Sequence, residues 1–149
     1  MSLESDVRLL RLVPLFAEFT DDQLRLLAFS AETRRLGAGV RLFASGERGD
    51  AGFVVAAGTI EFEDGRGGRE TCGPGTLIGE LGLVVETQRL GTATAVEPSE
   101  VIQIRRNLFR RMLEEYPGVA EAIRTHIARR LATMNVELAR VGALLEGGA

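Results

Sequence analysis

The hydrophobic pattern divides the chain into three zones. Residues 1–36 are rich in leucine and poor in glycine, whereas residues 37–91 hold 14 of the 18 glycines together with short β-branched runs. Residues 105–147 are dense in Arg, Leu, Ala and Glu and are nearly free of glycine up to Gly142. This pattern predicts helices, then a sheet, then helices again.

Two short helices are predicted in the first zone. Ser5 is placed to cap the first helix, and Pro14 ends it. Thr20 and Gln23 form a capping-box pattern that begins the second helix. The residues expected to face the core lie at helical spacing: Val7, Leu9, Leu10, Leu24 and Leu27.

Short apolar runs separated by glycine turns fill the middle of the chain. They are VRLF (40–43), GFVVA (52–56), TIEFE (59–63) and ATAVE (93–97), and SEVIQI (99–104) completes the series. Many short strands with this punctuation are typical of a closed roll or jelly roll. Together with the flanking helices, they predict an α+β fold that is mainly β.

The last zone predicts two further helices. Asn107 is placed to cap a helix that ends near Glu115, and Pro117 suits the first turn of the next helix. The second helix carries apolar residues at alternating spacings of four and three, as in a coiled-coil seam: Ile127, Leu131, Met134, Leu138, Val141 and Leu145. Such a helix either lies on its own sheet or pairs with a second copy, and we expect a homodimer through residues 123–145.

Length and charge restrict the possible functions. The 149 residues fit a single domain, with N-terminal helices in 1–30, a β-roll in 31–104 and C-terminal helices in 105–147. The net charge of −3 argues against a general nucleic-acid binder, although a local basic pocket stays possible. The arginines near the third helix adjoin acidic residues and are interpreted as a solvated face: Arg105, Arg106, Arg110 and Arg111.

Residues that commonly carry chemistry are few. Cys72 and His126 are the single cysteine and histidine, so the usual metal-ligand clusters are missing, and we expect both side chains to be structural. No nucleophile–base pattern is evident, so neither enzyme activity nor a cofactor is expected. The apolar runs are too short to span a membrane, and the first residues are acidic before they are apolar, so we expect a cytoplasmic protein without a membrane partner.

Residues 76–95, TLIGELGLVVETQRLGTATA, are mostly apolar or small but contain Glu80 and Arg89. Gly79 permits a sharp turn into a short helix from Glu80 to Val84, and free N–H groups at a helix start attract anions. The groups expected there belong to Gly79, Leu81 and Gly82. An arginine binds phosphate in a bidentate, charge-assisted pair, and a carboxylate accepts hydrogen bonds from sugar hydroxyls. The alternative is a Glu80–Arg89 salt bridge or two solvated loop charges.

This segment resembles the phosphate-binding cassette of the cyclic nucleotide-binding domain family. That family includes the bacterial catabolite activator, the regulatory subunits of cyclic-AMP-dependent kinase, and nucleotide-gated channels. The matching motifs are IGELGL (78–83) and RLGTA (89–93), and the run at 39–61 resembles the first roll segment of the family. The resemblance covers about residues 9–140. It implies an eight-stranded β-roll, or jelly roll, with short N-terminal helices and two C-terminal helices.

The resemblance also implies a ligand site. Glu80 would accept a hydrogen bond from the ribose 2′-hydroxyl, and Arg89 would pair with the cyclic phosphate. Asn135 would reach the base. The full set implied for ligand binding is Phe62, Ile78, Gly79, Glu80, Leu81, Gly82, Arg89, Leu90, Gly91, Thr92 and Asn135.

Departures from the family pattern leave these charged contacts in place. Gln88 stands where proline is common, Gly91 stands where alanine is common, and Leu90 stands where members selective for cyclic GMP often have threonine, which favours cyclic AMP. Only Gly-Gly-Ala follows the long helix, so a helix-turn-helix is not expected. The sequence therefore predicts a stand-alone cyclic AMP sensor that signals to an unidentified effector protein. The alternatives are a ligand-free dimerisation module and the regulatory domain of a larger transporter, channel or enzyme.

Overall fold

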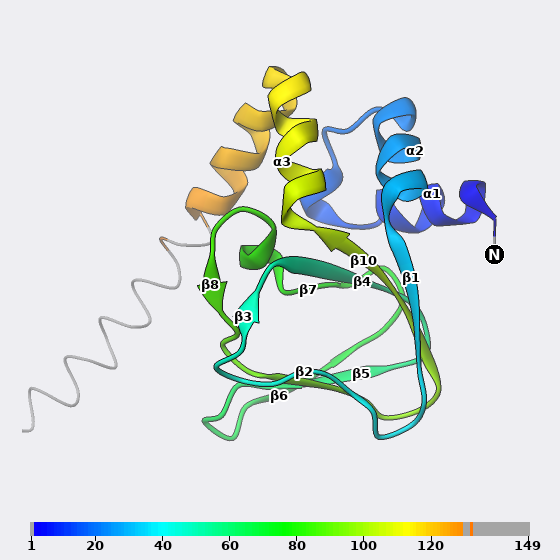
Figure 1. Ribbon diagram of the computed structural model, residues 1–149, viewed down its shortest axis with the longest axis vertical. Coiled ribbons are helices and arrows are strands. Elements are labelled where there is room, and N and C mark those ends of the chain that lie inside the picture. The colour runs from blue at the N-terminus through cyan, green and yellow to red at the C-terminus, as the bar shows by residue number, and fades with distance from the viewer. Residues whose placement is uncertain (1, 130–131, 133–149) are drawn as a thin grey trace, which may run out of the picture.

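The computed structural model describes residues 2–129 and residue 132. Two four-stranded antiparallel sheets, ordered β1-β10-β4-β7 and β2-β9-β5-β6, face each other as a roll, and β3 and β8 form a short ribbon beside them (Figure 1). The strands are β1 (Glu32–Leu36), β2 (Arg41–Phe43), β3 (Arg48–Gly49), β4 (Ala51–Ala57), β5 (Ile60–Glu63), β6 (Arg69–Cys72), β7 (Leu77–Ile78), β8 (Thr87–Gln88), β9 (Thr92–Ala95) and β10 (Ser99–Arg105).

The predicted α+β, mainly β, fold class is confirmed. The described residues contain ten strands rather than the expected eight. The difference lies in very short segments, because β3, β7 and β8 have two residues each. Within the described part of the chain, no helix has the length and apolar character needed to cross a membrane.

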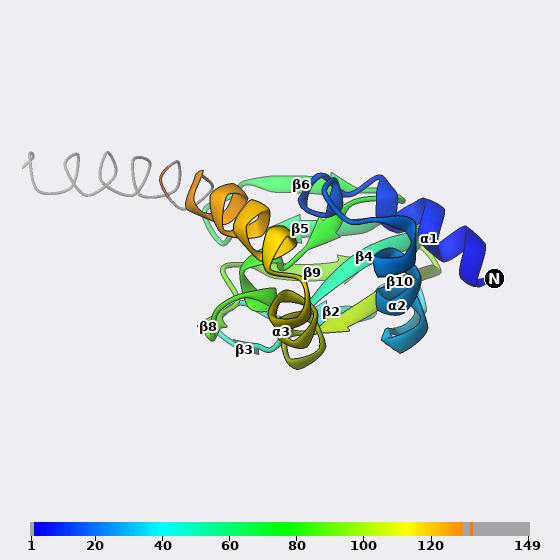
Figure 2. The same cartoon turned by 90° about the horizontal axis from the view of Figure 1, so that it is seen from above.

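The helices gather at one end of the roll (Figure 1). They are α1 (Leu3–Arg11), the 3₁₀ turn η1 (Pro14–Phe16), α2 (Asp21–Ser30) and α3 (Arg106–Glu115), and residues 117–129 form a further helix. Figure 2 looks down on this helical layer and shows it spread over the sheet that contains β4 and β10. A second 3₁₀ turn, η2 (Glu80–Leu83), lies in the cassette segment.

Local sequence explains most helix boundaries, with two corrections. The capping box of Thr20 and Gln23 is present as predicted. Ser5 does not cap α1, because Ser2 is the N-cap and Ser5 is the third helical residue of that capping box. Asn107 does not cap α3 either, since that helix begins at Arg106 after an extended Arg105.

Successive side chains along β4 point to opposite faces of the sheet and belong to two separate core clusters. Val54 packs against the helices, in a cluster that includes Leu10, Leu24 and Phe109. Phe53 and Val55 point to the opposite face and pack between the two sheets. The site described below lies where the helical layer, the roll and the cassette meet.

The helix that begins at Pro117 lies on the protein's own core over its first turns. Ile123 and Ile127 are 2% and 7% exposed and belong to the cluster beneath the helices. Most of the predicted seam, and Asn135 with it, falls outside the described residues. The homodimer through 123–145 therefore stays a prediction.

Candidate functional site

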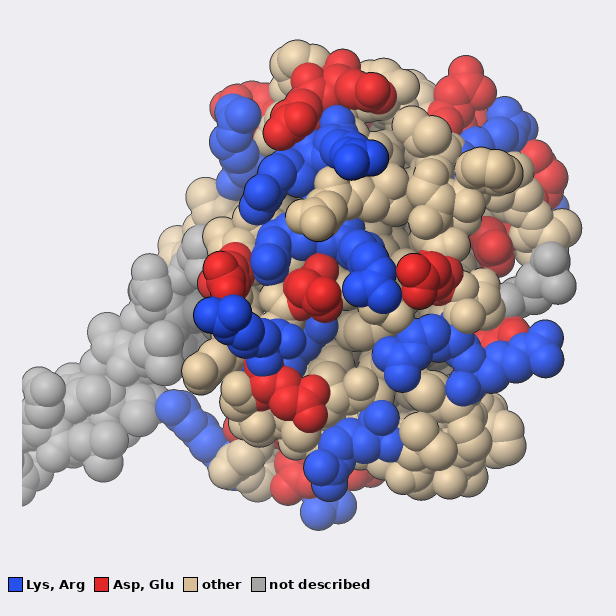
Figure 3. Space-filling view, in the orientation of Figure 1, with Lys and Arg blue, Asp and Glu red and all other residues tan. Residues whose placement is uncertain are grey.

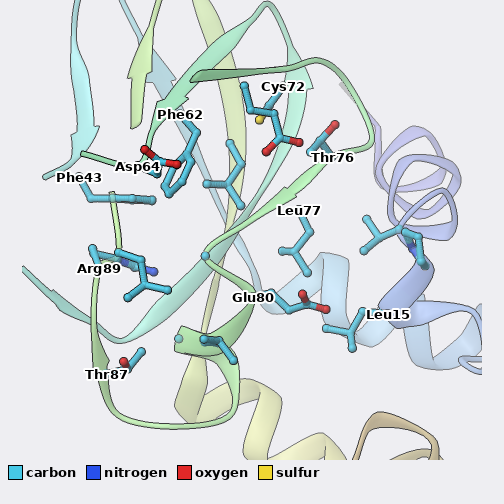
Figure 4. Close-up of a pocket in the computed structure, with 18 of the residues that line it drawn as sticks. Leu15, Phe43, Phe62, Asp64, Cys72, Thr76, Leu77, Glu80, Thr87 and Arg89 are labelled. Atoms are coloured by element: carbon cyan, nitrogen blue, oxygen red, sulfur yellow. The ribbon is translucent and has the colours of Figure 1, made fainter. Parts of the chain in front are cut away.

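A cavity of about 610 Å³ opens between the cassette, the β5–β6 hairpin and η1 (Figure 4). Its size is in the range of small-molecule sites. Eight of the eleven residues predicted from the sequence line it: Phe62, Ile78, Gly79, Glu80, Leu81, Gly82, Arg89 and Leu90. Gly91 and Thr92 do not line the cavity, and Asn135 lies outside the described residues.

Gly91 and Thr92 have structural contacts behind the cavity wall. A Cβ added at Gly91 would lie 2.5 Å from the Phe62 ring and 2.3 Å from the Glu63 carbonyl oxygen. The Thr92 hydroxyl accepts a hydrogen bond of 3.0 Å from the Ser45 N–H. Gly91 therefore leaves room for Phe62 and the Glu63 carbonyl, and Thr92 connects β9 to Ser45.

The cassette turns sharply at Gly79, as the sequence predicts. Its φ of 78° lies in the left-handed region, which glycine adopts without steric cost, and η2 begins at the next residue. The Gly82 N–H donates to the Gly79 carbonyl at 3.0 Å. One of the three amides expected to bind an anion is thus already engaged within the turn.

Arg89 is a buried cation in the cavity wall. Arg89 directly follows β8 in the sequence, and the residue is 8% exposed. The guanidinium lies 4.4 Å from the centroid of the Phe43 ring and 5.5 Å from that of Phe53, and one Nη donates to the Ala51 carbonyl at 2.9 Å. Arg89 Nε is one of two buried side-chain polar atoms in the described residues that have no hydrogen-bond partner.

Three glycines create the space for this guanidinium. A Cβ added at Gly49 would lie 2.9 Å from Arg89 Cζ, and one added at Gly79 or Gly82 would lie 2.5 or 3.0 Å from its Nη1. The sequence predicted that the Gly82 N–H contributes to an anion site. In the structure, the missing side chain at Gly82 leaves room for the Arg89 guanidinium.

The charge of Arg89 is only partly compensated inside the protein. Burial lowers the pKa of Arg89 below its ordinary value, while the nearby carboxylates of Asp50 and Glu47 act in the opposite direction. A buried cation with an unused N–H donor favours an anionic partner, since the anion recovers the cost of desolvation. Arg89 therefore has the chemistry of a phosphate or carboxylate binder.

Glu80 lies on a different part of the cavity wall from Arg89 (Figure 4). It is the first residue of η2, and its side chain is 15% exposed. Its Oε1 is 2.9 Å from Nε2 of His126, which comes from the helix at 117–129 and also lines the cavity. His126, which the sequence predicts to be a structural residue, therefore contacts one of the predicted ligand residues and lines the cavity.

The prediction that Arg106 belongs to a solvated face is wrong. Rather than facing solvent, its Nη1 donates to three carbonyl oxygens, those of Gly49 at 2.9 Å, Val85 at 3.1 Å and Gly82 at 3.4 Å. One side chain from the start of α3 thus connects β3 to η2 and to Val85, which follows η2. Because Gly49 and Gly82 also lie against the Arg89 side chain, Arg106 holds the backbone that surrounds this guanidinium.

The other arginines near α3 agree with a mixed surface. Figure 3 shows basic and acidic side chains interspersed on this face. Arg48 pairs with Glu86 at 3.2 Å, and Arg105 lies 3.3 Å from Glu32. This alternation does not resemble the continuous basic stripe expected of a nucleic-acid interface.

Beyond Arg89, an aromatic and mixed wall completes the cavity. Phe62 packs edge-on against Phe43 with ring centroids 6.3 Å apart. Cys72, Asp64 and Glu70 also line the cavity. Phe43 contacts both the Phe62 ring and the Arg89 guanidinium, so a flat, largely apolar group in contact with Phe62 would lie close to Arg89.

Comparison with known proteins identifies the family. The sequence profile described as "Cyclic nucleotide-binding domain" matches residues 33–116. The chain therefore belongs to the cyclic nucleotide-binding domain family, whose members are typically regulatory, non-catalytic modules.

Individual relatives share this domain in different contexts. The chain is 32% identical over 130 residues to the cyclic AMP receptor protein of Thermus thermophilus, an alignment that covers 84% of this chain and 60% of the relative. It is 31% identical over 111 residues to lysophospholipase NTE1 of Chaetomium globosum, covering 71% of this chain and 7% of that protein. It thus spans less than two thirds of either relative. The solved structure of a cyclic nucleotide-binding-like protein from Brucella abortus superposes with a TM-score of 0.65 at 46% identity, covering 73% of this chain and 97% of the other.

Proposed function

We propose that this chain is a regulatory domain that binds cyclic AMP, with the cyclic phosphate on Arg89 and the ribose 2′-hydroxyl on Glu80. The observation that carries the proposal is the buried Arg89 guanidinium, which lines the cavity with its Nε unpartnered. A cyclic phosphate carries a single negative charge and offers two exocyclic oxygens, so it matches the guanidinium fork in charge and geometry.

The dimensions of the cavity agree with a nucleotide rather than a bare anion. Glu80 and Arg89 lie on separate parts of the wall, and Phe62 lines the same cavity. A ribose between phosphate and base would bring its hydroxyl to the carboxylate. The base would then lie on the aromatic ring, where stacking on a π-face contributes about 1–3 kcal/mol.

The preference for cyclic AMP over cyclic GMP rests on Leu90. This residue is 57% exposed at the cavity rim and has no hydroxyl to donate to a guanine. We expect both nucleotides to bind, with cyclic AMP tighter. We expect a binding module without catalytic activity, located in the cytoplasm, that passes its signal to an effector protein and forms a homodimer through 123–145.

Native mass spectrometry of the purified protein tests the proposal. With cyclic AMP added, we expect one nucleotide mass per chain, with weaker occupancy by cyclic GMP and little by linear AMP, whose second phosphate charge and open geometry fit the site less well. The same spectra report the oligomeric state. A protein that acquires none of these masses but is dimeric would support the alternative, a ligand-free interaction module.

A further inference from the structure

We propose that His126 is an intramolecular competitor of the ligand and sets its affinity by occupying the Glu80 carboxylate. This inference rests on the proposed function, because it assigns the ribose 2′-hydroxyl to Glu80. It adds a residue on the C-terminal helix to those that determine binding.

The position of His126 is fixed by its neighbours on the helix. Ile123 and Ile127 are buried in the core beneath the helix, and His126 shares their side of it. Its Nε2 reaches Glu80 Oε1 at 2.9 Å, with side chains 34% and 15% exposed respectively. The carboxylate is therefore largely covered while the helix is docked.

The contact does not depend on a charged imidazole. A neutral histidine with its proton on Nε2 donates the same hydrogen bond as the imidazolium does. A carboxylate oxygen can accept more than one hydrogen bond, but a hydroxyl that approaches Oε1 on the side covered by His126 replaces this N–H, and part of its binding free energy is spent on that exchange. Hydrogen bonds to charged groups contribute more than neutral ones, so the exchange affects affinity measurably.

Linkage makes the effect reciprocal. If docking of the helix weakens ligand binding, then ligand binding must weaken docking of the helix by the same factor. Occupied Glu80 would release His126 and loosen residues 118–129 from the cassette. The signal to the rest of the protein would thus begin at this one hydrogen bond.

Calorimetric titration of wild type and His126→Leu with cyclic AMP and with 2′-deoxy-cyclic AMP tests the competition. Leucine keeps the apolar contacts and removes the donor, so we expect cyclic AMP to bind about three- to tenfold more tightly. The deoxy nucleotide does not compete for the carboxylate, so its affinity should stay within about twofold. Arg124→Leu is the matched control, since Arg124 pairs with Glu121 on the helix surface, and it should change neither affinity.

The remaining outcomes separate the two proposals. Weaker binding of cyclic AMP by His126→Leu would show that His126 contacts the ligand. Equal effects on cyclic AMP and 2′-deoxy-cyclic AMP would show that His126 obstructs the cavity in general. Either result, or unchanged affinity for both nucleotides, would overturn the proposed competition. Absence of saturable heat from both nucleotides in every protein would refute the proposed function itself. Hydrogen exchange of ligand-free protein adds an independent check, because residues 118–129 must exchange faster in His126→Leu than in Arg124→Leu.

Discussion

Replacing Arg89 by methionine should remove ligand binding while leaving the ligand-free fold nearly as stable as before. Methionine keeps most of the apolar stem and discards the charge and its donors. Two opposing contributions to stability are lost together. The desolvation cost of a buried guanidinium amounts to several kcal/mol, so its removal stabilises the fold.

The favourable contacts of Arg89 are of similar size. The hydrogen bond to the Ala51 carbonyl contributes about 1.5–3 kcal/mol. Packing of the cation on Phe43 and Phe53 contributes about 0.5–2 kcal/mol. We therefore expect the free energy of unfolding to change by less than about 1 kcal/mol, which for a domain of this size moves Tm by about 2–4 °C.

The effect on binding is much larger. Truncating one partner of a buried, hydrogen-bonded charge pair costs about 2–5 kcal/mol, so the Kd for cyclic AMP should rise about 30-fold to several thousandfold. Thermal unfolding with and without nucleotide measures both effects. Wild type at 100 times its Kd should gain about 2.7 kcal/mol and several degrees in Tm, whereas Arg89→Met should gain almost nothing.

Arg89→Lys is the control for charge without the guanidinium fork. It should bind more weakly than wild type and better than Arg89→Met, since an ammonium cannot bind phosphate in bidentate fashion. A fall of more than about 10 °C in the Tm of ligand-free Arg89→Met would show that the arginine is a structural residue. A nucleotide-induced Tm shift that survived in this variant would refute the phosphate assignment.

Three further predictions concern Arg106, Gly49 and Asp6. Arg106→Ala strands three carbonyl contacts and should destabilise the protein by about 1–3 kcal/mol in urea unfolding, with partial recovery in Arg106→Lys; an unchanged unfolding midpoint would contradict this role. Gly49→Ala places a Cβ 2.9 Å from the Arg89 guanidinium, so calorimetry should show roughly tenfold weaker cyclic AMP binding with Tm within about 4 °C of wild type, and unaltered affinity would mean that the guanidinium moves at no cost. Burial raises the pKa of the Asp6 carboxyl in the folded protein above its value in the unfolded chain, so the ionised carboxylate destabilises the fold at a pH above the folded-state pKa and has no effect at a pH below the unfolded-state pKa. Asp6→Asn should therefore raise Tm at neutral pH, and the difference in Tm from wild type should vanish on acidification. A difference in Tm that stayed constant across pH would show that ionisation of Asp6 is not its cause.

The sequence predicted the roll and the cassette because both depend on local signals. Three signals carried the prediction: the glycine turns, the short β-branched runs and the cassette motif. Each of them involves residues that lie only a few positions apart in the sequence. The left-handed Gly79 and the turn after it followed from the same local signals. Errors at helix starts have a local cause too, since Ser2 and Ser5 are both capping residues and only the structure decides between them.

Contacts between distant segments could not be predicted. His126 is an isolated histidine on a helix, and nothing near it in the sequence points to Glu80. Arg106 resembled a surface residue because its partners are backbone carbonyls, which leave no pattern in side-chain types. The role of Gly49 in admitting Arg89 is equally invisible, because the two residues meet only when β3 pairs with β8.

Titration of the wild-type protein with cyclic AMP in a calorimeter tests the central claim most directly. We predict saturable heat with one site per chain and a Kd in the micromolar range or below, unaffected by equimolar linear AMP. Absence of saturable heat at concentrations up to about 1 mM, where a ligand with a binding free energy near −4 kcal/mol would already be detected, would contradict the assignment of Arg89 and Glu80 to a cyclic nucleotide.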